Sequence, residues 1–205
     1  MDFISNYQGK PYQDSRWSAG SHLIPGRVFC AYYDLGGEGI AYHDHDAVNK
    51  GSGGLNPLDG TYLNEFRKDE GVDTSYVKFR DTIDNSSYNI VEPERDMLYV
   101  GWTEPDEWMR YTVSIAAANE YAVSLMFTSY AGGRISIEID DKNPSYFDVP
   151  STFDERDPLE WRQWHHWNKT ELGVLALPYG SHVITLRTVE KGNMNYAYLE
   201  FKPYR

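Results

Sequence analysis

The feature that most constrains the fold is an alternation of apolar and polar residues with a period of two. In the segment RISIEID, Ile135, Ile137 and Ile139 fall on one face of an extended strand and polar side chains fall on the other. The same period appears in residues 121–127 and 182–189. No window of helical length repeats apolar residues at three and four positions, and turn-forming sequences such as AGG, DDKNP and LPYGSH punctuate the second half. The pattern predicts an all-β chain, folded as a β-sandwich jelly roll.

Shorter apolar segments predict the remaining strands. They are residues 27–33, 98–102, 108–115, 146–149, 164–172 and 196–202. An aromatic fraction of 15% suits a β-rich protein or a stacking surface.

The domain organisation follows from length and local composition. A chain of 205 residues is enough for one large domain. Residues 1–23 show no clean period and are interpreted as an N-terminal arm or linker remnant, so that the domain itself covers residues 24–205. Residues 50–95, rich in Gly, Asn, Asp and Ser, are interpreted as long loops at one end of the sandwich.

Charge and cysteine content narrow the class of partner. The formal net charge of -12 provides no electrostatic reason to bind nucleic acid or an anionic membrane. A single cysteine, Cys30, rules out an intrachain disulfide and does not distinguish an oxidising from a reducing compartment. The sequence has neither an apolar run of membrane-spanning length nor a signal peptide, so for an exported protein we expect the signal to lie outside this sequence.

The segment GGEGIAYHDHD is the first candidate for chemistry. His43, Asp44, His45 and Asp46 are all of types that ligate metals. On a strand, however, the two histidines point to one side and the two aspartates to the other, so only two of the four converge without a turn. We therefore interpret the segment as a solvated or hydrogen-bonding loop, and predict no catalytic transition metal there.

Paired carboxylates and exposed tryptophans are the other candidates. The segment TEPDEW carries three acids, and two carboxylates suffice for glycoside hydrolysis, but among 31 acidic residues nothing marks one pair as catalytic. Trp102 and Trp161 lie in polar, turn-rich sequence, where an indole ring suits stacking against a sugar. The alternative is that both rings close the ends of the sandwich.

Five motifs in order resemble the family six carbohydrate-binding modules. They are IPGRVFCAYYDLGGEGIAYHDHDAVN, RKDEGVD, YVGWTEPDEWMRYTV, WRQW and NMNYAYLEF, which together extend from about residue 24 to residue 201. The long GGEGIAYHDHD form looks like the subgroup found beside enzymes that act on marine or plant polysaccharides. The resemblance implies a non-catalytic β-sandwich, usually attached to a secreted glycoside hydrolase, that binds glycan at its loops. It also implies an extracellular or periplasmic location.

The resemblance also implies the ligand-binding residues. Trp102 and Trp161 match the two aromatic residues that sandwich a sugar ring, and Asn195 matches an asparagine that bonds sugar hydroxyls. Glu38 matches a loop acid that often contributes. Asp44 or Asp46 is expected either to bond the ligand or to hold a loop cation, and the sequence does not separate these alternatives.

The calcium ligands of the family are not matched. Many members hold a structural calcium ion with two glutamates on the first strand and an acid or amide near the last, all of them oxygen ligands. Here Phe29, Ala31 and Ala197 occupy those positions. We therefore predict no cofactor and no calcium at this site, while a calcium ion in the loop from Glu38 to Asp46 is left open.

Three functions follow in order of preference. The first is a non-catalytic module that binds a polysaccharide or oligosaccharide and neighbours a glycoside hydrolase domain. The second is a glycoside-active enzyme that uses cleft carboxylates such as Glu38 and Glu104. The third is a scaffold domain with a vestigial cleft, whose N-terminal arm packs on a neighbouring domain.

Overall fold

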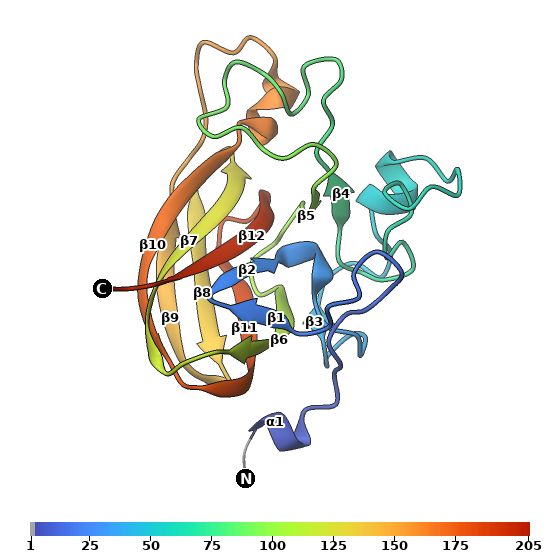
Figure 1. Ribbon diagram of the computed structural model, residues 1–205. Helices are drawn as coiled ribbons and strands as arrows, with labels where there is room; N and C mark the ends of the chain where they lie inside the picture. The colour runs from blue at the N-terminus through green and yellow to red at the C-terminus, as the bar shows by residue number, and fades with distance from the viewer. Residues whose placement is uncertain (1–2) are drawn as a thin grey trace.

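The computed structural model describes residues 3–205 as two β-sheets packed face to face (Figure 1). The first sheet has the strand order β1-β6-β11-β8-β9, with β3 paired to β6. Its strands are β1 (His22–Ile24), β3 (Tyr42–His43), β6 (Trp108–Ile115), β8 (Gly133–Ile139), β9 (Lys142–Val149) and β11 (Gly180–Glu190).

The second sheet has the order β10-β7-β12-β5-β4, with β2 paired to β12. Its strands are β2 (Gly26–Phe29), β4 (Thr74–Tyr76), β5 (Leu98–Val100), β7 (Asn119–Ser129), β10 (Asn168–Leu177) and β12 (Met194–Pro203). Apart from the parallel pair β1 and β6, neighbouring strands are antiparallel. The predicted all-β sandwich is confirmed.

Short helical segments lie in the N-terminal segment and in the connections between strands. They are α1 (Phe3–Asn6), the 3₁₀ turn η1 (Cys30–Tyr32), the irregular turn η2 (Gly51–Leu55) and the 3₁₀ turn η3 (Glu160–His165). The predicted strand 27–33 is shorter in the structure, because residues 30–32 turn and β2 ends at Phe29. The predicted strand 164–172 is shifted, because η3 continues to His165 and β10 runs from Asn168 to Leu177. No helix within residues 3–205 has the length and apolar character needed to cross a membrane.

The core lies between the two sheets, and the second sheet is also covered on its outer side. The central strand β12 is buried on both faces along most of its length. Its outer face packs in a cluster with Val77, Met97 and the fully buried Trp167, all of which come from the loops. Burial of one such large side chain contributes about 2–3 kcal/mol. The loops of residues 77–97 are therefore part of the folded domain.

The N-terminal segment packs on its own sandwich. Lys10 forms an isolated bridge with Leu35, and Tyr12 is buried in a cluster with Phe66. The Trp17 ring stacks on Tyr32 with 4.6 Å between centroids. The predicted boundary between residues 23 and 24 falls inside β1, which hydrogen-bonds to β6.

One end of the sandwich carries the long loops. In Figure 1 the green loop that follows β4 and the orange loop that precedes β10 lie side by side at this end, away from α1. Backbone hydrogen bonds from Ile90 and Val91 to the Trp167 carbonyl oxygen, 2.9 and 3.0 Å long, join the two loops. Of the predicted loop region 50–95, only β4 enters a sheet, where it pairs with β5.

Candidate functional site

A cavity of about 680 Å³ opens at the loop end of the sandwich. This volume lies in the range of small-molecule sites, about 300–1,000 Å³. The walls come from η2 and the loop after it, β4 and the loop after it, β5 and the residues after it, η3, and the turn into β12. They are lined by Leu55, Asn56, Pro57, Asp59, Asn64, Tyr76, Lys78, Arg80, Ile83, Tyr99, Trp102, Trp161, Trp164, His165, Asn193 and Asn195.

Trp102 enters this cavity from a strained backbone position. It follows β5 and has a φ of 50°, a left-handed conformation that is rare for a bulky side chain and costs about 1–2 kcal/mol. Its ring lies beside η2, where a Cβ on Gly51 would come within 3.1 Å of the indole. Strain of this kind concentrates at binding sites.

Trp161 and Trp164 are presented by η3. The Trp161 side chain is half exposed, whereas Trp164 stacks on Tyr130 with 4.8 Å between centroids. The backbone oxygen of Trp164 accepts hydrogen bonds from Thr128 Oγ1 at 2.6 Å and Asn195 Nδ2 at 2.8 Å. The turn is thereby tied to the ends of β7 and β12.

A buried ion network holds the segment that leads into η3. Asp157, whose side chain is fully buried, accepts hydrogen bonds from Arg162 Nε at 2.6 Å and Nη2 at 2.7 Å. The second partner is His166, which is equally buried, with Nε2 at 2.8 Å from Asp157 Oδ2. The Arg162 guanidinium and the His166 ring lower the pKa of the Asp157 carboxyl. Asp157 and His166 lie before and after Trp161 and Trp164 in the sequence. The network therefore keeps the turn that carries the two tryptophans in place.

Asn195 lies in the cavity wall at the start of β12. Its amide nitrogen donates to Thr128 Oγ1 and to the Trp164 carbonyl, both at 2.8 Å, which leaves the amide oxygen as the group able to accept from a ligand. A Cβ on Gly101 would lie 2.6 Å from that oxygen. A side chain at residue 101 would therefore push the Asn195 amide oxygen out of this position.

The structure brings Trp102, Trp161 and Asn195 together, but it places the three predicted acids elsewhere. Glu38 pairs with His43 Nδ1 at 2.5 Å and accepts from the Asp44 backbone nitrogen at 3.1 Å. Asp46 forms an ion pair with Lys50. None of Glu38, Asp44 and Asp46 lines the cavity. Their oxygens contact groups of their own loop, and a ligand contact through them stays a prediction.

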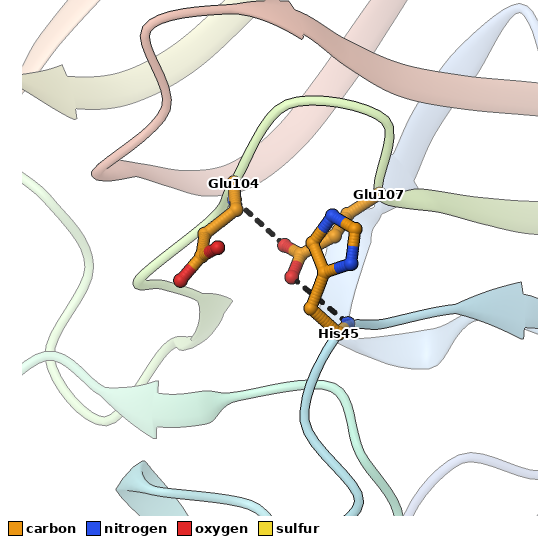
Figure 2. A group of neighbouring side chains, drawn as sticks. All are labelled: His45, Glu104 and Glu107. Carbon is orange, nitrogen blue, oxygen red and sulfur yellow. Dashed lines mark hydrogen bonds between the residues drawn. The ribbon is translucent and has the colours of Figure 1, made fainter.

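Another acid group joins this loop to the segment before β6. The Glu107 carboxylate accepts hydrogen bonds from the backbone nitrogens of Glu104 at 2.7 Å and His45 at 3.3 Å (Figure 2). One ligand atom from each of His45, Glu104 and Glu107 lies within 4.8 Å of the others. Since both Glu107 oxygens already accept from backbone, we assign the group a structural role in joining the two loops.

The burial of Asp73 near other carboxylates predicts that the stability of the protein depends measurably on pH. Burial, together with nearby Asp46 and Glu104, raises the pKa of Asp73 to about 6. Because the unfolded value is near 4, the folded state binds more protons between these values, so this carboxyl makes the protein less stable as pH rises from about 4 to about 6. We expect Asp73→Asn to stabilise the protein at pH 8 by about 1 kcal/mol, or about 2–4 °C in Tm.

Thermal denaturation between pH 4 and pH 8 measures this effect as the difference between variant and wild type. Asp148→Asn, which changes a 90% exposed side chain on β9, is the control and should leave the profile unchanged. A constant difference between Asp73→Asn and wild type across this range would contradict the assignment.

The positions of the family calcium site do not fit a calcium ion. Ala31 and Ala197 are fully buried in apolar clusters, and Phe29 packs edge-on against Tyr198 with 5.8 Å between centroids. These side chains offer no oxygen ligand to a hard cation. That no calcium binds here stays a prediction.

Several cavity residues were missed by the sequence reasoning. Tyr76, Lys78 and Arg80 fall in the region interpreted as loops, where no periodicity marks them. Trp164 was detectable, because it is the second aromatic residue of the WRQW motif. Its spacing of three from Trp161 places both on one side of a 3₁₀ turn.

Comparison with known proteins identifies the fold. No protein-family model matches the sequence, and no curated protein is significantly similar to it. Among solved structures, a family six carbohydrate-binding module of Clostridium stercorarium in complex with cellobiose has a TM-score of 0.53 at 10% identity, covering 91% of this chain and 99% of that one. A β-1,3-glucan-binding family six module of Bacillus halodurans has a TM-score of 0.51 at 14% identity, covering 89% and 98%. The chain has the fold of the family six carbohydrate-binding modules.

A third structure contains a similar fold as part of a larger protein. An arabinoxylan arabinofuranohydrolase of Bacillus subtilis, in complex with cellotetraose, has a TM-score of 0.51 at 14% identity. The match covers 95% of this chain but only 33% of that enzyme. The predicted resemblance to family six is confirmed at the level of the fold, whereas the predicted subgroup stays a prediction.

Proposed function

We propose that this chain is a non-catalytic carbohydrate-binding module that binds polysaccharide in the cavity at the loop end. The observation that carries the proposal is the convergence of Trp102, Trp161 and Trp164 in one cavity with the amide side chain of Asn195. Indole faces stack on the C–H faces of pyranose rings, and amides satisfy the ring hydroxyls. With few such contacts, we expect affinities on the order of micromolar to millimolar.

The ligands of similar structures support this choice. The Clostridium stercorarium module was solved with cellobiose, and the Bacillus halodurans module is described as binding β-1,3-glucan. We infer a ligand of the same general class, an oligosaccharide or polysaccharide, for this chain.

The composition of the cavity supports binding without catalysis. Glycoside hydrolysis by the common mechanisms needs two carboxyl groups flanking the scissile bond. Of the lining residues, all drawn from the described part of the chain, only Asp59 carries one, and its oxygens accept hydrogen bonds from Thr61 and Asn64. Glu38 and Glu104, the acids of the catalytic alternative, lie outside the cavity lining.

We further propose that the module works beside a glycoside hydrolase domain in an extracellular or periplasmic setting. The match to one third of the arabinofuranohydrolase supports this arrangement. A module of this kind holds its neighbouring enzyme at the polysaccharide surface, which raises the effective concentration of substrate.

Affinity electrophoresis against a panel of soluble polysaccharides, with a parallel assay for released reducing ends, tests the proposal. We expect at least one polysaccharide to retard the protein and none to be cleaved. Trp161→Ala should weaken that binding about tenfold or more while leaving the fold intact, because the side chain is half exposed.

The control is Tyr179→Ala, which truncates another exposed aromatic residue at the turn between β10 and β11. It should bind as the wild type does. A panel without any retardation would point to a scaffold domain, and release of reducing ends would point to an enzyme.

A further inference from the structure

Two cations line the cavity at alternate positions of one segment. Tyr76 is the last residue of β4, and Lys78 and Arg80 follow it at spacings of two. In an extended chain, alternate residues project to the same side. The segment therefore presents an aromatic ring and two positive charges to the same cavity.

Neither cation forms a salt bridge with a carboxylate in the described part of the chain. Among residues 3–205, no salt bridge reaches Lys78 or Arg80, whereas other cations of the protein are paired, as Arg27 is with Glu94 and Lys169 with Glu200, and others such as Lys142 are exposed at the surface outside the cavity. In a chain with a net charge of -12, two unpaired cations in one cavity are opposite to the overall trend.

Two acids in the neighbourhood of this segment, Asp59 and Asp84, are already engaged. Asp59 lines the cavity, but its carboxylate accepts from Thr61 and Asn64. Asp84 is fully buried behind the wall, where it accepts from the Lys78 backbone nitrogen, His165 Nδ1 and Trp167 Nε1 at 2.7, 2.8 and 2.8 Å. The side-chain charges of Lys78 and Arg80 are thus left facing the cavity.

Lys78 is held in place but only partly satisfied. Its Nζ donates to Ser75 Oγ at 3.2 Å and lies 4.4 Å from the centroid of the Tyr76 ring. Burial lowers the pKa of this ammonium, so its charge is partly desolvated and gains from an anionic partner.

We propose that the ligand is an anionic polysaccharide, whose sugar rings carry carboxylate or sulfate groups, and that Lys78 and Arg80 bind these groups while the tryptophans stack on the rings. The guanidinium of Arg80 offers a planar pair of donors that suits either anion, and Lys78 adds a point charge. This inference rests on the proposed function, since it names the class of glycan that the same cavity takes.

The first test measures affinity for polygalacturonate, alginate, glucuronoxylan and κ-carrageenan, each beside its own carboxyl-reduced or desulfated derivative, with laminarin and arabinoxylan as neutral polymers. We expect the tightest ligand to be anionic and to lose about tenfold or more in affinity when neutralised. The carboxylated and sulfated polymers distinguish the two sources of charge. Raising NaCl from 20 to 500 mM should weaken this binding, because the charges become screened.

The second test changes the cations themselves. The double variant Lys78→Gln and Arg80→Gln should lose about tenfold or more in affinity for the anionic polymer and keep any affinity for neutral ones. The matched control is Lys142→Gln with Arg205→Gln, which removes the same charge from exposed positions outside the cavity. It should bind as the wild type does, and circular dichroism verifies that both double variants fold.

The outcomes separate this inference from the proposed function. If a neutral polymer binds at least as tightly as every anionic one, or if the Lys78 and Arg80 variant binds the anionic polymer unchanged, the anionic ligand is wrong and carbohydrate binding stands. If no polysaccharide binds, the proposed function fails, and this inference fails with it.

Discussion

Replacing Trp102 by glycine is expected to abolish carbohydrate binding while the protein stays folded. The indole lines the cavity, and loss of a central tryptophan of this kind costs about 2 kcal/mol or more, which is about thirtyfold or more in affinity. Stability changes little, because glycine relieves the left-handed backbone strain at φ 50° and thereby offsets the lost packing of a partly exposed ring. Isothermal titration and a thermal melt measure the two effects.

Trp102→Ala distinguishes the effect of backbone strain on stability from the effect of ring stacking on binding. Alanine removes the ring but keeps a Cβ in the left-handed backbone region. It should lose binding as fully as glycine and have the lower Tm of the two variants. Trp108→Ala, on β6 and outside the cavity, is the matched control and should bind normally. Binding retained by Trp102→Gly would move the site to another surface of the sandwich.

Asp157→Ala is expected to have the largest effect on stability. The substitution leaves the buried Arg162 guanidinium and the fully buried His166 without their shared carboxylate. Removing one partner from a buried ion network costs about 3–5 kcal/mol. Binding should also weaken, because Trp161 and Trp164 lie on the turn that the network holds. Urea denaturation measures the free energy of unfolding.

Asp148→Ala supplies the comparison for Asp157→Ala. Asp148 pairs with Arg134 at 3.6 Å on the surface, where its side chain is 90% exposed, and loss of an exposed pair costs about 0–1 kcal/mol. Adding Arg162→Met to Asp157→Ala should recover part of the lost stability, since it removes the orphaned charge. Equal losses from Asp148→Ala and Asp157→Ala would show that the buried network does not stabilise the η3 segment.

Much of the sandwich was predictable because its long strands have a local signature. Strand β6 was predicted with its observed bounds, residues 108–115, and β7, β8 and β11 follow the period of two. Where the prediction overran, at residues 30–32 and 164–167, buried side chains such as Cys30, Ala31 and Trp167 lie outside the strands, so the local composition resembles that of a strand. The short strands β1, β3 and β4 were missed, because two or three residues do not establish a period.

The sequence by itself determined the fold class and indicated the aromatic half of the candidate site. Strand periodicity records which side chains face the core, and Trp102, Trp161 and Asn195 stand in motifs that the family resemblance placed in one cleft, where the structure brings them together. Only the tertiary structure decided which charged residues join them. In the structure, Glu38, Asp44 and Asp46 form hydrogen bonds or ion pairs within their own loop. Lys78 and Arg80 reach the cavity from a segment whose sequence has no periodicity. The local pattern of apolar residues indicates which side chains are buried. Which distant loops come into contact depends instead on how the whole sandwich packs.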